Sequence, residues 1–183
     1  TKGMGLDPRI GPSFLRAGLG YGGSCFPKDV AAFIHMADGV GLDFKILKAV
    51  REINDAARAW AVDALKKSLW TLRDKTIAVW GLAFKPDTDD LRNAPALDII
   101  ARIQAEGGRV NAYDPVAMTK ARALLKDVRF CRNPYDAARG VDAVVLATEW
   151  KEFRDADLAR LKALVRTPVF VDGRNALSPA ALS

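Results

Sequence analysis

The segment Lys75-Thr76-Ile77-Ala78-Val79-Trp80-Gly81 decides the fold, because here the chain changes from long helical periodicity to short β-branched runs. From this point such runs alternate with helical stretches, a pattern typical of parallel strands joined by crossover helices. We expect strands at residues 76–80, 109–113, 128–131, 143–147 and 169–171, and helices at 96–105, 117–125, 135–138 and 155–165. Five strands in about 110 residues predict a doubly wound sheet, which binds ligands at the carboxyl ends of its strands.

The residues before this segment predict a helical region. A glycine-rich loop covers roughly the first thirty residues, a helix follows Pro27 to about Ala37, and a second helix opens near Asp43, its expected N-cap. Apolar residues then repeat every three to four positions, which predicts a helix of about 26–30 residues against a mean near 12. So wide an apolar face needs a cover, which we expect to be a second copy of the chain. The predicted architecture is α/β, with a helical dimerisation segment at residues 1–73 and a Rossmann-like doubly wound parallel sheet at 74–183.

Composition limits the classes of function. The 183 residues are 50% apolar and 27% charged, with no membrane-length apolar stretch and no signal-peptide pattern, so we expect a cytoplasmic protein without membrane association. Two distant cysteines and one histidine, His35 in an apolar run, exclude a disulfide framework, a four-ligand zinc site and a Ser-His-Asp triad, and no metal site is expected. The net charge of +6 favours anionic partners. Because the basic residues are dispersed, we expect phosphate on a small molecule and no nucleic acid.

A glycine-rich loop leads directly to one of the cysteines. The run Gly18-Leu19-Gly20-Tyr21-Gly22-Gly23-Ser24-Cys25 does not follow a strand, so it is not a dinucleotide fingerprint, but its small residues allow close approach of a ligand. Cys25 precedes Pro27 and a helix start, with Lys28 three residues on; a helix N-terminus and an ammonium both favour a nucleophilic thiolate. Asp29 is placed to act on a proton near the sulfur. The alternatives are that Cys25 is a small buried hydrophobe and Asp29 a helix cap.

Cations follow two of the predicted strands. The long turn between the first strand and the next helix carries Lys85 and Arg92 and ends at a helix N-terminus, a natural anion site. Alternatively, these cations neutralise the turn's own carboxylates, Asp87, Asp89 and Asp90. Arg174 lies just past the last strand, where it suits a phosphate or sugar oxygen, with an ion pair to Asp172 as the alternative. Asp114 and Glu149 also follow strands, but acids at such positions are commonly turn and cap residues.

Four motifs, in order along the chain, resemble UDP-glucose 6-dehydrogenases. They are Arg9-Ile10-Gly11 with Gly20-Tyr21-Gly22-Gly23-Ser24-Cys25-Phe26-Pro27-Lys28-Asp29, then Gly81-Leu82-Ala83-Phe84-Lys85-Pro86-Asp87-Thr88-Asp89-Asp90-Leu91-Arg92, then Tyr113-Asp114-Pro115, then Asp172-Gly173-Arg174. The resemblance implies an N-terminal NAD-binding domain, a long central dimerisation helix and a C-terminal Rossmann-like domain that binds the UDP sugar. This chain resembles the central and C-terminal portions. We therefore expect a fragment, inactive alone, whose cofactor NAD is bound mainly by the absent N-terminal domain.

The resemblance also implies a role for each matching residue. Cys25 matches the catalytic cysteine, which attacks the aldehyde from the first hydride transfer to give a thiohemiacetal that a second NAD oxidises to a thioester. Asp29 matches an aspartate that positions or activates water for hydrolysis. Lys28 is expected near the cofactor and Arg92 on the NAD pyrophosphate. The implied substrate contacts are Phe14, Tyr21, Gly22, Phe84, Lys85, Arg174 and, across the dimer, Arg9.

The implied activity is NAD-dependent oxidation of UDP-glucose to UDP-glucuronate. A sister dehydrogenase of GDP-mannose or UDP-N-acetylmannosamine is an alternative, although Phe26 and the run Phe84-Lys85-Pro86 favour the UDP-glucose branch. A further alternative is a UDP-sugar-binding and dimerisation module without catalysis.

Overall fold

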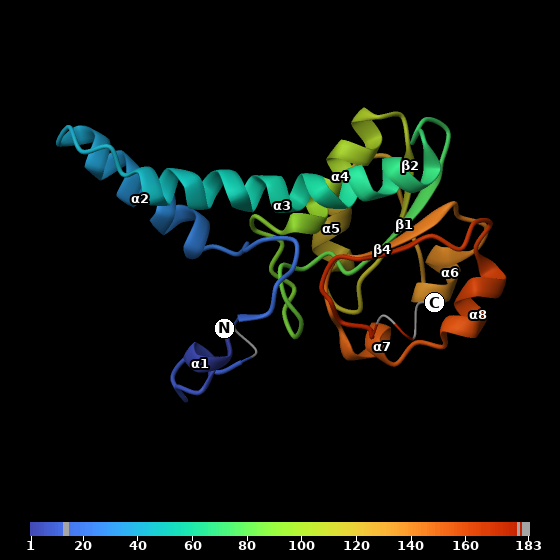
Figure 1. The fold of residues 1–183 in the computed structure, drawn as a ribbon. Helices are drawn as coiled ribbons and strands as arrows, with labels where there is room; N and C mark the ends of the chain where they lie inside the picture. Colours follow the sequence, from blue (N-terminus) through green and yellow to red (C-terminus); the bar gives the residue numbers. More distant parts are fainter. Residues whose placement is uncertain (13–14, 179, 181–183) are drawn as a thin grey trace.

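The computed structural model describes residues 1–12, 15–178 and 180, and it has an α/β fold (Figure 1). Within these residues one parallel sheet runs in the order β3-β2-β1-β4-β5. Its strands are β1 (Thr76–Trp80), β2 (Arg109–Tyr113), β3 (Val128–Phe130), β4 (Ala143–Leu146) and β5 (Phe170–Asp172). The predicted strands are therefore confirmed to within one residue at each end. Chain order reverses between β1 and β4, so the loops that follow these strands lie where such sheets bind ligands.

Helices cover both faces of the sheet. On one face lie the C-terminal half of α3 (Lys45–Leu69), α4 (Pro95–Ala105) and α5 (Met118–Leu124). The other face carries α6 (Pro134–Ala138), α7 (Lys151–Arg154) and α8 (Leu158–Leu164). Successive side chains of a strand point to opposite faces. Ile77 and Val79 of β1 accordingly enter the first core, and Ala78 and Trp80 enter the second.

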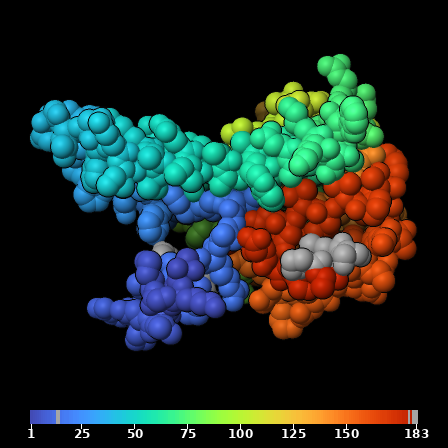
Figure 2. All heavy atoms as spheres, in the orientation of Figure 1, coloured from blue at the N-terminus to red at the C-terminus, as the bar shows by residue number. Residues whose placement is uncertain are grey.

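The long helix α3 forms an arm together with α2 (Phe26–Gly39). Its C-terminal half packs on α4, whereas its N-terminal half and α2 project away from the sheet, and a hollow opens between this arm and the N-terminal segment (Figures 1 and 2). Lys48 Nζ joins the two arm helices through Asp38 and Asp43, at 2.9 and 3.0 Å. Large exposed apolar side chains mark the arm: Phe33, Met36, Val40, Leu42, Ile46, Val50, Ile53 and Trp60. No helix among the described residues is long and apolar enough to cross a membrane.

Three local expectations are corrected. Asp43 does not cap α3: the N-cap is Phe44, without a side-chain hydrogen bond, because the Asp43 carboxylate is taken by Lys48. The helix expected at 155–165 begins only at Leu158, since Asp157 Oδ1 accepts the amide hydrogen of Arg160 at 2.9 Å and caps α8 there, and α7 forms separately before it. The short helix α1 (Lys2–Gly5) lies in the segment expected to be an irregular loop.

Candidate functional site

The glycine-rich loop that precedes Cys25 is anchored to the carboxyl edge of the sheet. Its first part contacts the segment that follows β5: Leu19 is fully buried against Gly173, and Asn175 Nδ2 donates to the carbonyl of Ala17 at 3.1 Å. Further along, Tyr21 is held by α3, where the Asn54 side chain both accepts from its amide at 2.7 Å and donates to its carbonyl at 3.2 Å. The loop that leads to Cys25 is therefore fixed at two points, against the segment after β5 and against α3.

Cys25 occupies the N-cap position of α2. Its carbonyl accepts the amide hydrogen of Asp29 at 2.8 Å, and Pro27 stands in the first turn, where its missing N–H costs nothing. The thiol is exposed, and its Sγ lies 3.6 Å from Ser24 Oγ. The alternative of a small buried hydrophobe is therefore wrong for Cys25. Cys131, in contrast, is a small buried hydrophobe: it is 3% exposed, and burial raises the pKa of its thiol.

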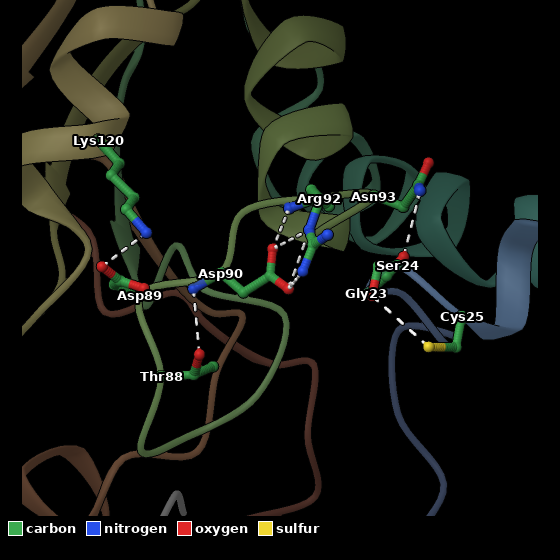
Figure 3. A network of polar contacts seen from close by, with 9 residues as sticks. All are labelled: Gly23, Ser24, Cys25, Thr88, Asp89, Asp90, Arg92, Asn93 and Lys120. Carbon is green, nitrogen blue, oxygen red and sulfur yellow. Dashed lines mark hydrogen bonds and ion pairs between the residues drawn. The ribbon is translucent and has the colours of Figure 1, made fainter.

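The loop between β1 and α4 meets the cysteine loop along its backbone (Figure 3). The amide of Gly23 donates to the carbonyl of Arg92 at 2.9 Å, and Asn93 Nδ2 donates to the carbonyl of Gly23 at 3.2 Å. A β-carbon on Gly22 would stand 2.4 Å from the Asn93 carbonyl oxygen, and Gly23 has a φ of 83° with the Phe84 ring directly against it. Only glycine fits so close an approach, so this pair of glycines seats the cysteine loop on the β1–α4 loop.

Arg92 presents a cation beside Cys25. Its Nε and Nη2 donate to both carboxylate oxygens of Asp90, at 2.9 and 2.7 Å, and these bonds lower the pKa of Asp90 to about 2. The hydrogen bonds to Asp90, its charge and, more weakly, the Cys25 sulfur raise the pKa of Arg92. The expected neutralisation of the loop's acids thus applies to Asp90, whereas Asp89 pairs with Lys120 of α5 at 2.8 Å. The Arg92 side chain is 68% exposed, which leaves it accessible to an anion.

Arg174 forms an ion pair, but not with Asp172, the partner that the alternative interpretation named. Its Nε and Nη2 bind Glu149 Oε2 and Oε1 at 2.6 and 3.0 Å, whereas Asp172 accepts the backbone amides of Arg174 and Leu177. Burial raises the pKa of Glu149, but hydrogen bonding and the charge of Arg174 outweigh it, so the pKa lies below its ordinary value. The pair joins the ends of β4 and β5 at the ligand-binding edge.

Asp114 connects the loops at this edge of the sheet through hydrogen bonds. It is fully buried, and its two oxygens accept five N–H groups: from Leu82, Ala83 and the Trp150 indole on Oδ2, and from Val116 and Ala117 on Oδ1. These donors come from the loops that follow β1, β2 and β4. A residue that we expected to be an ordinary turn acid therefore fixes three loops to one another.

The other predicted site residues are less closely gathered. Tyr21 stacks on Phe26 with ring centroids 5.6 Å apart, and Lys85 Nζ lies 5.3 Å from the Phe84 ring centroid. Lys28 and Asp29 form an exposed ion pair of 3.4 Å on the first turn of α2. Arg9 pairs with Asp7 in the N-terminal segment, which lies apart from the sheet (Figure 1). Phe14 lies outside the described residues.

Two residues of α3, Asn54 and Arg58, contact the site although no role was expected for them. Arg58 Nη2 donates to the carbonyls of Tyr21 at 2.9 Å and Asn93 at 3.2 Å, so it contacts both loops of the site. A signal was present for Asn54, because its spacing to Ala61 and Leu65 places it on the helix face that is otherwise buried and apolar. No such signal marked Arg58. In the described part of the chain, no group of three or more His, Cys, Asp or Glu side chains is arranged to hold a metal ion.

Fold and site together define a doubly wound sheet domain whose carboxyl edge carries an exposed thiol on an anchored loop. Residues 78–179 match the UDP binding domain of the UDP-glucose/GDP-mannose dehydrogenase family, and residues 1–56 match that family's central domain. The chain therefore belongs to the UDP-glucose/GDP-mannose dehydrogenase family.

Relatives with curated names agree with this membership. The chain is 46% identical over 179 residues to the UDP-glucose 6-dehydrogenase TuaD of Bacillus subtilis, covering 97% of this chain and 39% of the relative. It is 44% identical over 191 residues to the UDP-glucose 6-dehydrogenase of Pseudomonas aeruginosa, covering 100% and 42%. The solved UDP-glucose dehydrogenase of Pyrobaculum islandicum superposes with a TM-score of 0.82 at 36% identity, covering 94% of this chain and 42% of the other. The chain thus spans about two fifths of the length of these relatives.

Proposed function

We propose that this chain supplies the nucleophilic cysteine and the UDP-sugar site of an NAD-dependent dehydrogenase that oxidises UDP-glucose to UDP-glucuronate. The observation that carries the proposal is the position of Cys25. Cys25 occupies the N-cap position of the 14-residue helix α2, its thiol is exposed, and its loop is hydrogen-bonded to the β1–α4 loop at the carboxyl edge of the sheet. The thiolate of an accessible cysteine is the form that attacks a carbonyl carbon.

The substrate site lies along the same edge in this proposal. The Arg174 guanidinium and the Lys85 ammonium attract the diphosphate, and the Phe84 and Tyr21 rings offer flat surfaces to the base and sugar. Gly22 lies on the same loop as Tyr21, and we assign it to the substrate by resemblance. We assign Phe14 and Arg9 to the same substrate by resemblance, Arg9 from a second copy of the chain.

Cys25 carries the covalent chemistry. Its thiolate adds to the C6 aldehyde, the new oxyanion takes a proton, and a thiohemiacetal results. Two NAD molecules, bound in turn, would supply the oxidant: the first would take a hydride from the primary alcohol to leave the aldehyde, and the second would take a hydride from the thiohemiacetal to leave the thioester. Water then adds to the thioester carbonyl and the C–S bond breaks. The sugar acid departs as the carboxylate, and Cys25 is restored to the free thiol. Asp29, one helical turn from Cys25, positions that water.

The residues around the thiol fit a dinucleotide pyrophosphate. Arg92 is largely exposed on one loop and Lys28 is exposed on the first turn of α2, so two cations flank Cys25 without being buried in the fold. We therefore propose that Lys28 and Arg92 hold NAD at this edge, and that a further domain supplies most of its binding surface.

The arm supports assembly. We propose that residues 1–73 form a dimerisation segment and that residues 74–183 form the UDP-sugar-binding domain. The exposed apolar side chains of α2 and α3, among them Ile46 and Ile53 at 73% and 70% exposure, form a surface that a second copy of the chain would bury. Sedimentation of wild type and Ile53→Asp tests this: a dimer that the substitution dissociates is expected, and a wild-type monomer contradicts it.

Calorimetry tests the substrate. UDP-glucose and UDP-glucuronate should bind the chain in preference to GDP-mannose and UDP-N-acetylmannosamine, and Arg174→Met should weaken binding at least tenfold. Preference for GDP-mannose or UDP-N-acetylmannosamine would assign the sister activity, and absence of nucleotide-sugar binding would refute the site. In an enzyme that joins this chain to an NAD-binding domain, Cys25→Ser should stop net formation of the acid.

A further inference from the structure

One guanidinium on α3 touches both loops of the site. Arg58 Nη2 donates to the carbonyl of Tyr21 at 2.9 Å in the cysteine loop and to the carbonyl of Asn93 at 3.2 Å in the β1–α4 loop. Asn54 lies one helical turn earlier and holds the same Tyr21 peptide through both its amide and its carbonyl. Helix α3 therefore holds the cysteine loop by hydrogen bonds at Tyr21, four residues before Cys25.

Further hydrogen bonds connect the two loops to each other and form a short ladder. Beyond the Arg58 bridge, the Gly23 amide donates to the carbonyl of Arg92, and Asn93 Nδ2 donates to the carbonyl of Gly23 (Figure 3). Asn93 adopts a left-handed φ of 50°, which exposes its carbonyl to Arg58 while its side chain reaches Gly23. Removal of Arg58 would thus release the carbonyls of both loops at the base of this ladder.

Arg58 is poorly explained as a stabilising residue. Its Nε is the one buried side-chain nitrogen or oxygen among the described residues that has no hydrogen-bond partner. A buried donor without an acceptor destabilises the fold, and no carboxylate of residues 1–12, 15–178 or 180 pairs with the guanidinium. The contacts that Arg58 does make are to carbonyls of the cysteine loop and its neighbour. These contacts point to a role in the geometry of the loops.

We propose that Arg58, assisted by Asn54, is a positioning residue that fixes the cysteine loop against the β1–α4 loop and so sets the place of the Cys25 thiol. The use of that thiol in oxidation rests on the proposed function; the fixing of the loop does not. Arg58 contacts neither the thiol nor the cations assigned to the substrate, and it holds Tyr21 by the backbone carbonyl rather than by the ring. Its loss should therefore affect the chemical step more than substrate binding.

Amide hydrogen exchange tests the fixing directly. In Arg58→Met, the Tyr21 and Gly23 amides should exchange at least about tenfold faster than in wild type, while amides of β1 and β4 stay unchanged. Arg58→Lys should restore part of the protection, because an ammonium can reach one of the two carbonyls. The matched control is Arg51→Met, since Arg51 is an exposed residue of the same helix, two turns earlier, and should leave exchange as in wild type.

The outcomes separate the two proposals. Unchanged protection of Tyr21 and Gly23 in Arg58→Met, or faster exchange throughout the sheet, would overturn the positioning role, whatever the substrate proves to be. In an enzyme that carries an NAD-binding domain, Arg58→Met should lower kcat at least tenfold and leave KM for UDP-glucose within about twofold. A rise in KM with kcat retained would also overturn it. Failure of UDP-glucose to bind wild type would refute the proposed function and leave the exchange result standing.

Discussion

Substitution Asp114→Asn should show how strongly one buried carboxylate holds the site together. In the wild type, Oδ2 accepts from Leu82 at 2.7 Å, Ala83 at 3.2 Å and the Trp150 indole at 3.2 Å. Oδ1 accepts from Val116 and Ala117 at 2.9 and 2.7 Å. An amide has one oxygen and one NH2 group. Its best orientation keeps the three bonds of Oδ2 and turns the NH2 toward two backbone donors.

The magnitude follows from those two donors. Each buried N–H left without an acceptor costs about 1–3 kcal/mol, so the substitution should lower the free energy of unfolding by about 2–6 kcal/mol. That loss is large against a total stability of roughly 5–15 kcal/mol for a domain. Asp114→Ala should cost more, because all five donors lose their acceptor.

Urea unfolding followed by tryptophan fluorescence measures the loss in stability. The Trp150 indole binds Asp114 directly, and Trp80 is buried in the adjoining core. The control is Asp87→Asn. Asp87 is an exposed loop residue with a φ of 60°, which asparagine tolerates, so this variant should stay within about 0.5 kcal/mol of wild type. A loss below about 1 kcal/mol in Asp114→Asn would refute the five-donor account.

Two further predictions concern the same edge. Gly22→Ala should destabilise the chain by about 1–3 kcal/mol, because the added methyl would stand 2.4 Å from the Asn93 carbonyl oxygen. The control is Gly39→Ala, which has open space around the added methyl and should not destabilise the chain. Thermal unfolding of both variants measures the difference. Glu149→Gln should cost about 2 kcal/mol at pH 7, because the amide removes the negative charge and one of the two oxygens that accept from Arg174. Because the folded-state pKa of Glu149 is lowered, this stabilisation is present above the unfolded value of about 4.3 and lost as pH falls through the folded value. Urea titrations should thus show a wild-type advantage at neutral pH that shrinks as the pH falls below the unfolded value, and a constant difference would contradict the ion pair.

The sheet could be predicted from the sequence because its signals are local. Each strand is a short β-branched run, and Pro95 and the Gly107-Gly108 pair mark where α4 begins and ends. The exposed thiol at a helix start could also be predicted, since Pro27 and the glycines stand next to Cys25 in the chain. These features need no knowledge of distant segments.

The partners of the site residues could not be predicted, because the fold brings them together from afar. Glu149 reaches Arg174 across 25 residues, since β4 and β5 are neighbours in the sheet, whereas Asp172 is closer in sequence but accepts the backbone amides of Arg174 and Leu177. Likewise, Arg58 meets Tyr21 and Asn93 only after α3 has packed against the sheet. An arginine on a helix surface gives no sequence signal of such contacts.

The central claim is that Cys25 attacks an aldehyde derived from the bound sugar. The most direct measurement uses UDP-glucose oxidised to the aldehyde at C6 and labelled with ¹³C at that carbon, added to the chain and followed by NMR. Wild type and Cys131→Ala should both give a new resonance from a carbon bonded to sulfur and oxygen, and Cys25→Ser should give only the aldehyde and its hydrate. Identical spectra from wild type and Cys25→Ser would contradict the account.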